Sequence, residues 1–217
     1  MTLDGKWRRF NTEWEATNNS PSPRIGITGT QASVDSCDIL IWGAQVEKGS
    51  FPTSYIPTSG STATRAADVA SIPVSAFGYN QKSGTFFAEF SCNDPAQATS
   101  NWILSTAGNA RLIYNNSATA WAAYDGTNFT GFGNLPQDGT LVKAALGMDS
   151  SGSSSVADGV VVNPAGAATP QVNIGYTDTL YIGRLFNAST NQLNGHIKSI
   201  KYYPRRLTNA QLQELTQ

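Results

Sequence analysis

The stretch GTFFAEFSC, residues 84–92, decides the fold, because its apolar side chains recur at every second position. Successive side chains of an extended strand point to opposite faces, so this alternation predicts a strand with one buried face. The side chains on that face are Phe86, Ala88, Phe90 and Cys92. The stretch GTLVKAALGMD, residues 139–149, repeats the pattern. Its buried face comprises Val142, Ala144, Leu146 and Met148.

Turn signals divide the same part of the chain into short strands. Gly108-Asn109, Asp125-Gly126 and Asp158-Gly159 each stand between two short, largely apolar stretches. Such pairs suit two-residue hairpin loops, whose positions require φ above zero. Short strands at this spacing, with no long helical period between them, predict an all-β antiparallel sandwich. The serine-rich residues 150–155 are interpreted as a long loop.

The last residues of the chain predict a helix. Thr208 and Gln211 have the spacing of a capping box, and Leu207 and Leu212 occupy the positions of a hydrophobic staple. We therefore expect a short helix from about Asn209 to Leu215, lying over the end of the sandwich.

The strand before that helix, GHIKSIKYY, does not alternate cleanly. A β-bulge at Lys198–Ser199 would place Ile197, Ile200 and Tyr202 on the core face.

A change in composition marks a domain boundary. Residues 59–67, SGSTATRAA, contain no large apolar side chain and are predicted to be a linker, with the sandwich at 68–217. The region 1–58 is expected to contain strands at Lys6–Trp14, Arg24–Thr28 and Asp38–Val46. The last of these, DILIWGAQV, is nearly continuously apolar, as a central sandwich strand would be.

Composition and charge exclude several classes of protein. Charged residues make up 13% of the chain, and 14 Lys and Arg nearly balance 15 Asp and Glu. A nucleic-acid-binding protein would show a basic excess, so we predict no nucleic-acid partner. No apolar stretch approaches the ~20 residues of a membrane span, and the N-terminal residues lack the apolar region of a signal peptide. Cys37 and Cys92 lie in different predicted modules and are expected to be two buried thiols.

Two segments resemble known families. Residues 41–58, IWGAQVEKGSFPTSYIPT, followed by TRAAD at 64–68, resemble the end of the carbohydrate-binding-module-like jelly rolls of bacteriophage tail fibres and tailspikes. Residues 179–215 resemble the last strands and closing helix of concanavalin A-like lectin sandwiches of the laminin-G or pentraxin type. The resemblance implies a concanavalin A-like jelly roll with a short C-terminal helix, preceded by a partial jelly-roll segment at 1–58.

The same resemblance implies a function in a virion. The chain would be a module of a phage tail fibre, tailspike or capsid appendage that binds host cell-surface polysaccharide, and it would be released by host lysis. Its expected partners are that polysaccharide, other virion proteins and further copies of the chain, in a trimer by analogy with phage fibres. Two alternatives remain open: a structural or attachment domain that binds no sugar, and the non-catalytic end of a capsule depolymerase.

A candidate sugar site lies around the predicted hairpin WAAYDGTNF, residues 121–129. Aromatic planes stack on the apolar face of a sugar, while amides and carboxylates bind its hydroxyls. The candidate residues are Trp121, Tyr124, Asp125, Asn128 and Phe129, with Asn115 on the neighbouring strand extending the site. Trp121 and Tyr124 are three positions apart, so on a regular strand they face opposite ways. Burial of Trp121 in the core is an equally good interpretation.

Catalysis and metal binding are not predicted. His196 is the only histidine and is expected to be an exposed strand residue, and no G-x-S-x-G elbow or paired-carboxylate strand motif of glycanases occurs. Calcium is bound by families that the chain resembles. Asp125 with Asn128, or Asp149 with Asp158, could contribute oxygen ligands. Neither pair forms a spaced ligand loop, so no metal-ligating residue or cofactor is assigned.

Overall fold

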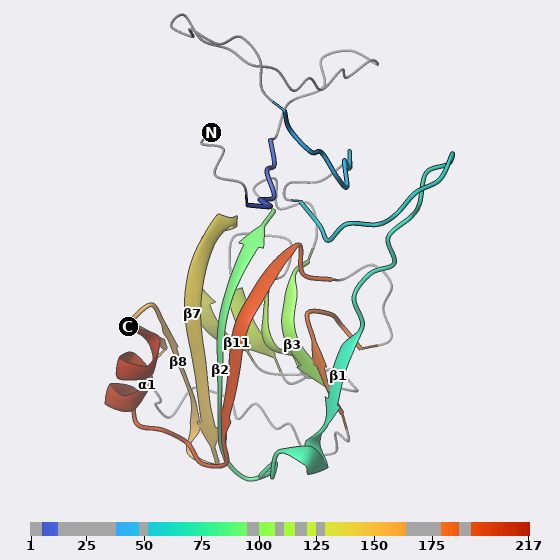
Figure 1. The fold of residues 1–217 in the computed structure, drawn as a ribbon. Coiled ribbons are helices and arrows are strands. Elements are labelled where there is room, and N and C mark those ends of the chain that lie inside the picture. Colours follow the sequence, from blue (N-terminus) through green and yellow to red (C-terminus); the bar gives the residue numbers. More distant parts are fainter. Residues whose placement is uncertain are drawn as a thin grey trace, which may run out of the picture. The chain divides into compact units, whose positions relative to one another are not determined.

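The computed structural model describes nine segments of the chain: residues 6–12, 38–47, 52–94, 100–106, 111–115, 121–124, 129–163, 179–186 and 192–217. The chain divides into two compact units, Met1–Arg65 and Ala66–Gln217, and the division falls within the predicted linker 59–67. All strands and helices assigned in the described segments belong to the second unit (Figure 1). None of these helices is long and apolar enough to cross a membrane.

The second unit is an antiparallel β-sandwich, as the turn pairs and strand alternation predict. One sheet has six strands in the order β1-β10-β3-β4-β5-β6, and the other has five in the order β11-β2-β7-β8-β9. The strands of the first sheet are β1 (Ala70–Pro73), β10 (Thr179–Ile182), β3 (Trp102–Thr106), β4 (Arg111–Asn115), β5 (Trp121–Tyr124) and β6 (Phe129–Gly133). Those of the second are β11 (Gly195–Tyr203), β2 (Gly84–Asn93), β7 (Asp138–Asp149), β8 (Gly152–Ala157) and β9 (Val160–Asn163). A 3-10 turn at Val74–Ala76 follows β1.

The central strand β2 buries both of its faces. Phe86, Ala88, Phe90 and Cys92 point into the main core between the sheets, as their alternation predicts. Across the ladder, Phe86 pairs with Leu146 and Phe90 with Val142 of β7, so the predicted faces of the two strands meet the same core. Phe87, on the opposite face of β2, belongs to a second apolar cluster outside the sandwich.

That second cluster is covered by the helix α1 (Asn209–Thr216), which packs on the outer face of the five-stranded sheet. Thr208 caps the helix, and the predicted capping box with Gln211 is present. Leu207 and Leu212 are both buried there, in agreement with the staple pattern. Gly147 of β7 makes room beneath the helix, because a Cβ atom at that position would lie 3.3 Å from Leu212 Cδ1.

The irregular strand β11 contains the predicted bulge. Its register against β2 shifts between Ile197 and Ser199, and Ile197, Ile200 and Tyr202 all pack against the main core. Tyr202 lies against Phe86, with ring centroids 4.8 Å apart, while Tyr203 joins the cluster under α1. The bulge is the reason why two isoleucines three positions apart share one face.

One predicted hairpin turn is described in full. Asp158 and Gly159 have φ values of 44° and 76°, the positive angles that a two-residue turn between β8 and β9 requires. The Asp158 carboxylate secures the turn by accepting a hydrogen bond of 2.8 Å from the Lys143 N–H. Gly108-Asn109 and Asp125-Gly126 lie outside the described residues, although the strands on either side of each pair are antiparallel neighbours.

The serine-rich stretch is not the loop that its composition predicts. Residues 152–157 form β8, and Ser153, Ser154 and Ser155 are fully buried. Their hydroxyls have partners, because Ser153 binds the Thr130 hydroxyl of β6 and Ser155 donates to the Gly131 carbonyl. Hydrogen bonds across this edge of the sandwich therefore replace apolar contact between the sheets.

The described residues of the first unit form none of the strands expected there. Residues 6–12 and 38–47 contain no strand, and Arg24–Thr28 lies outside the described residues. Side chains hold this unit together instead: Gln45 Oε1 accepts a 2.9 Å hydrogen bond from the Ile56 N–H, and Glu47 Oε1 accepts one of 2.7 Å from the Thr53 N–H. The Trp42 and Tyr55 rings are in contact, with centroids 4.8 Å apart. DILIWGAQV remains outside any sheet, since the described residues of the unit supply no strands to cover it.

Candidate functional site

An exposed aromatic pair stands at the end of the six-stranded sheet. Tyr124, the last residue of β5, and Phe129, the first of β6, are cross-strand partners, and their rings stack with centroids 4.4 Å apart and planes 25° apart. Phe129 is 55% exposed, and Tyr124 is half-buried. Both residues flank residues 125–128, which include the predicted turn pair Asp125-Gly126 and lie outside the described residues. The pair offers an aromatic surface of the kind that packs on the apolar face of a sugar ring.

Regular alternation along β5 explains why Tyr124 faces outward. Trp121 and Ala123 are buried in the main core, whereas Ala122 and Tyr124 lie on the opposite face of the strand. Trp121 is fully buried, and its ring centroid lies 5.1 Å from that of Phe90. Of the two interpretations open for Trp121, the structure supports the core residue, because a ring with no exposed surface cannot stack on a ligand.

Asn115 is also removed from the surface. It is fully buried at the end of β4, where its Nδ2 donates a 2.8 Å hydrogen bond to Gln137 Oε1 and its backbone N–H donates to the Asn101 carbonyl. Asn101 Nδ2 in turn donates to the Asp94 carboxylate. Asn115 therefore belongs to a buried polar cluster that joins β4 to neighbouring chain segments. Asp125 and Asn128 lie outside the described residues.

Asp149 and Asp158, the second pair of possible calcium ligands, lie far apart in the structure. Asp149 ends β7, and Asp158 follows β8, so the six residues of β8 hold them about 20 Å apart at ~3.3 Å per residue. Each carboxylate has its own partners: Ser151 and Arg206 for Asp149, and the Lys143 N–H for Asp158. No group of three His, Cys, Asp or Glu side chains in the described segments could hold a metal ion.

The single histidine lies away from the aromatic pair. His196 is exposed on β11, opposite Ser91 of β2, as its position beside Ile197 predicts. Nearby, the Lys198 ammonium lies 2.7 Å from the Glu89 carboxylate. A hydrogen bond from Lys198 holds the pKa of Glu89 below its usual value. Glu89 is therefore an ionised partner of a surface lysine.

Cys92 is a free thiol buried in the core, as predicted, whereas Cys37 lies outside the described residues. Burial, reinforced by the nearby Asp94 charge, raises the pKa of the Cys92 thiol to about 12. A protonated thiol is a poor nucleophile, so Cys92 acts as a small apolar core residue.

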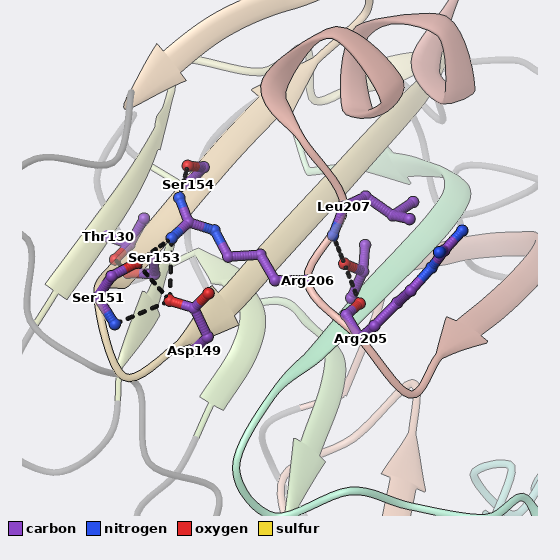
Figure 2. A network of polar contacts seen from close by, with 9 residues as sticks. Thr130, Asp149, Ser151, Ser153, Ser154, Arg205, Arg206 and Leu207 are labelled. Carbon is purple, nitrogen blue, oxygen red and sulfur yellow. Dashed lines mark hydrogen bonds and ion pairs between the residues drawn. The ribbon is translucent and has the colours of Figure 1, made fainter.

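A polar network that the sequence did not reveal surrounds Arg206, just before α1. Figure 2 shows the guanidinium group pointing into the turn between β7 and β8. Its Nη1 donates to Asp149 Oδ1 at 3.0 Å and to Ser151 Oγ at 2.7 Å, and its Nη2 donates to Ser154 Oγ at 2.8 Å. Beside it, Thr85 Oγ1 accepts from the Leu207 N–H and donates to the Arg205 carbonyl. These bonds fasten the segment before α1 to the sheet below.

A small cleft of about 290 Å³ opens beside this network. It is lined by Asp149, Arg206, Leu207, Thr208 and Asn209. The Arg206 and Asp149 charges neutralise one another, and Thr208 is committed to capping the helix. The polar groups of this cleft therefore serve mainly to position α1, and the aromatic pair remains the better candidate for a ligand site.

We expect Asp149 to make stability depend on pH in the acid range. Burial pushes the pKa of Asp149 upward, but hydrogen bonds from Ser151 and Arg206 outweigh this effect and leave it below the usual value. Because the folded pKa lies below the unfolded value of about 3.9, the stabilisation is present above that pH and is lost as the pH falls through the folded pKa. Urea unfolding of wild type and Asp149→Asn should show a stability difference that shrinks from pH 6 to pH 3. A difference that stays constant with pH would contradict this assignment.

Comparison with known proteins establishes the fold but no family. No family model matches the sequence, and no curated protein is a significant match. Among solved structures, the CBM40 domain of the Ruminococcus gnavus IT-sialidase bound to α2,3-sialyllactose is similar, with a TM-score of 0.51 and 16% identity. The match covers 65% of this chain and 86% of that one. The same domain in a second structure gives a TM-score of 0.51 and 17% identity over the same shares.

A sialidase from Trypanosoma rangeli, in complex with sialic acid, is also similar, with a TM-score of 0.46 and 18% identity over 61% of this chain. The match covers only 22% of the sialidase chain. The CBM40 likeness, which extends over most of that domain, shows that the described sandwich shares its fold.

Proposed function

We propose that the unit Ala66–Gln217 binds carbohydrate, with Tyr124 and Phe129 as its stacking surface. The observation that supports this most is the exposed, stacked pair at the end of β5 and β6. A solvent-facing aromatic surface that the core does not require is typical of a binding site. The CBM40 domain of the same fold class was solved bound to α2,3-sialyllactose, which supports a sugar as the ligand class.

Composition favours a ligand recognised through hydroxyl groups. Only 13% of the residues are charged. Amide and hydroxyl side chains around an aromatic surface suit hydrogen bonding to sugar hydroxyls. Asp125 and Asn128, between Tyr124 and Phe129 in sequence, are the polar residues that we propose to complete the site.

We further propose that the protein works in a phage virion, as a non-enzymatic module of a tail fibre, tailspike or capsid appendage that binds host surface polysaccharide. The support is the resemblance of residues 41–58 to phage adhesion proteins. Several weak sites on one particle would strengthen attachment through effective concentration, which suits a trimer or another homo-oligomer.

Replacing Tyr124 or Phe129 with alanine should weaken polysaccharide binding about tenfold, because an aromatic contact contributes up to about 1.5 kcal/mol. A glycan array would identify the ligand, and calorimetry would compare the variants with wild type. Tyr181→Ala is a matched control, since Tyr181 also lies in the six-stranded sheet and forms an aromatic contact with Phe186.

The binding variants should remain folded. Phe129 is largely exposed, so its replacement should change stability by no more than about 0.5 kcal/mol. Unchanged binding in both variants would place the sugar site elsewhere. A wild-type protein that binds no glycan would favour the structural or attachment role.

A further inference from the structure

The strand that carries Phe129 is one whose own sequence specifies its register weakly. β6 reads FTGFG, with glycine at two of its five positions. It ends the six-stranded sheet, so among the described strands only β5 pairs with it in that sheet. Glycine-rich strands are prone to slippage, and a slip of one residue moves every side chain to the opposite face. Such a slip would carry Phe129 from the exposed face of the sheet to the core face.

Hydrogen bonds from the opposite sheet hold β6 in its register. Thr130, which follows Phe129 directly, shares a hydrogen bond with the Ser153 hydroxyl of β8. One residue further along, Ser155 Oγ donates to the Gly131 carbonyl. Thr130 and Ser153 are fully buried, where the low dielectric constant strengthens a hydrogen bond. Because side chains alternate along a strand, Thr130 is held on the inside while Phe129 faces the solvent.

β8 is suited to hold β6 because it is itself fixed on every side. It pairs with β7 along one edge and with β9 along the other. Figure 2 shows Ser153 beside Thr130, while Ser154 is directed to Arg206. Ser154 Oγ accepts a 2.8 Å hydrogen bond from Arg206 Nη2. The end strand of one sheet is therefore fastened to an inner strand of the other.

Stability alone does not account for hydroxyl groups at positions 130 and 153. Replacing both partners of a buried hydrogen bond with apolar groups of the same shape can be nearly neutral. Apolar contact is non-directional, so it would fill the space between β6 and β8 without fixing how far β6 is displaced along its axis. A hydrogen bond forms only within a narrow range of distance and angle. The hydroxyl pair therefore selects one register.

We propose that Thr130 and Ser153 are positioning residues for the aromatic pair: their hydrogen bond fixes the register of β6, and that register holds Phe129 against Tyr124. In this register Tyr124 and Phe129 are direct cross-strand partners, which brings their ring centroids to 4.4 Å. The inference rests on the proposed sugar site for its functional meaning. Neither hydroxyl group contacts the sugar, and both act through Phe129.

Two substitutions at position 130 separate the hydroxyl group from the shape of the side chain. Thr130→Val keeps the shape and removes the hydroxyl, whereas Thr130→Ser keeps the hydroxyl and removes the methyl group. NMR of the full chain with labelled tyrosine, without any glycan, reports the ring contact, because the Phe129 ring shifts the Tyr124 ring signal. Tyr124→Phe assigns that signal. Thr130→Val should move it toward its position in Phe129→Ala, and Thr130→Ser should leave it close to wild type.

Affinity for the glycan that wild type binds gives the second measurement. Thr130→Val should weaken binding about fivefold, which corresponds to the ~1 kcal/mol net contribution of one hydrogen bond. Thr130→Ser should bind as wild type does. Combined with Phe129→Ala, Thr130→Val should cause no further loss, because a residue that acts through Phe129 has no effect in its absence.

Ser154→Ala is the matched control. Ser154 is as buried as Ser153 and lies on the same strand, but its hydroxyl binds Arg206. This variant should leave both the Tyr124 signal and the affinity unchanged.

An unchanged Tyr124 signal in Thr130→Val would overturn the inference. So would an equal shift in Ser154→Ala, which would indicate a general loosening of the sandwich, or a loss of affinity in Thr130→Val that adds in full to that of Phe129→Ala. A wild-type protein that binds no glycan would overturn the proposed function alone. In that case the NMR measurement without glycan still decides whether the hydroxyl pair positions Phe129.

Discussion

Replacing Trp121 with alanine is expected to lower the free energy of unfolding by about 3 to 5 kcal/mol, the range for truncating a large buried aromatic residue. Trp121 is fully buried in the main core and packs against Phe90 of the opposite sheet. Its removal would leave a cavity between the two sheets that the surrounding strands cannot close. Urea unfolding followed by circular dichroism measures the loss.

Trp121→Phe provides a control for this experiment. It keeps most of the aromatic surface and removes Nε1, which is buried without a hydrogen-bond partner among the described residues. An unpaired buried N–H group carries a desolvation cost, so this variant should lose much less stability than Trp121→Ala. Nearly equal stability of wild type and Trp121→Ala would mean that Trp121 lies at the surface, where it could join the sugar site.

Leu212→Ala is expected to destabilise the protein by about 2 to 4 kcal/mol. Leu212 is fully buried beneath α1, where it belongs to the same cluster as Phe87 and Leu207. The change would remove the main contact between the helix and the five-stranded sheet. Thermal and urea unfolding of the full chain measure the effect.

Glu214→Ala serves as the matched control in the same helix, since Glu214 is exposed. Surface substitutions of this kind usually change stability by less than about 0.5 kcal/mol. A change of that small size for Leu212→Ala would show that the helix does not dock on the sheet.

Elements with strong local signals were predictable from the sequence. The alternation in β2 and β7 reflects strands that present one face to a shared core, and it placed Phe86 and Leu146 correctly. The cap at Thr208 satisfies backbone N–H groups locally, so it requires no knowledge of the rest of the fold. The bulge near Ser199 could be located because Ile197 and Ile200 had to reach the same core.

The site was harder to predict because exposure depends on neighbouring strands. Spacing showed that Trp121 and Tyr124 face opposite ways, but only the second sheet decides which face is covered. The burial of Asn115 depends on Gln137, which is distant in sequence. The buried serines of β8 were missed for the same reason: the hydroxyl partners of Ser153 and Ser155 lie on β6, that of Ser154 is Arg206, and no local pattern identifies them.

Residues 38–46 of the first unit show the opposite error. Composition predicts a central strand for DILIWGAQV, yet no strand forms at residues 38–47. Strand propensity describes how well a side chain fits a half-buried pleated surface, so it has no effect until other strands supply that surface. The sequence reveals the tendency of this segment to pair but not its partner.

The topology determines how late in synthesis the two sheets can be completed. β10 lies between β1 and β3, so the first sheet requires a strand at residues 179–182. β11, at residues 195–203, lies beside β2 in the second sheet (Figure 1). During synthesis, Phe87 and its neighbours on β2 emerge more than a hundred residues before Tyr203 and Leu212 can cover them. The nascent chain must therefore carry unfinished sheets until residues 179–217 have been synthesised. Such long-range closure folds slowly, and chaperones that shield early strands should increase the yield of folded protein.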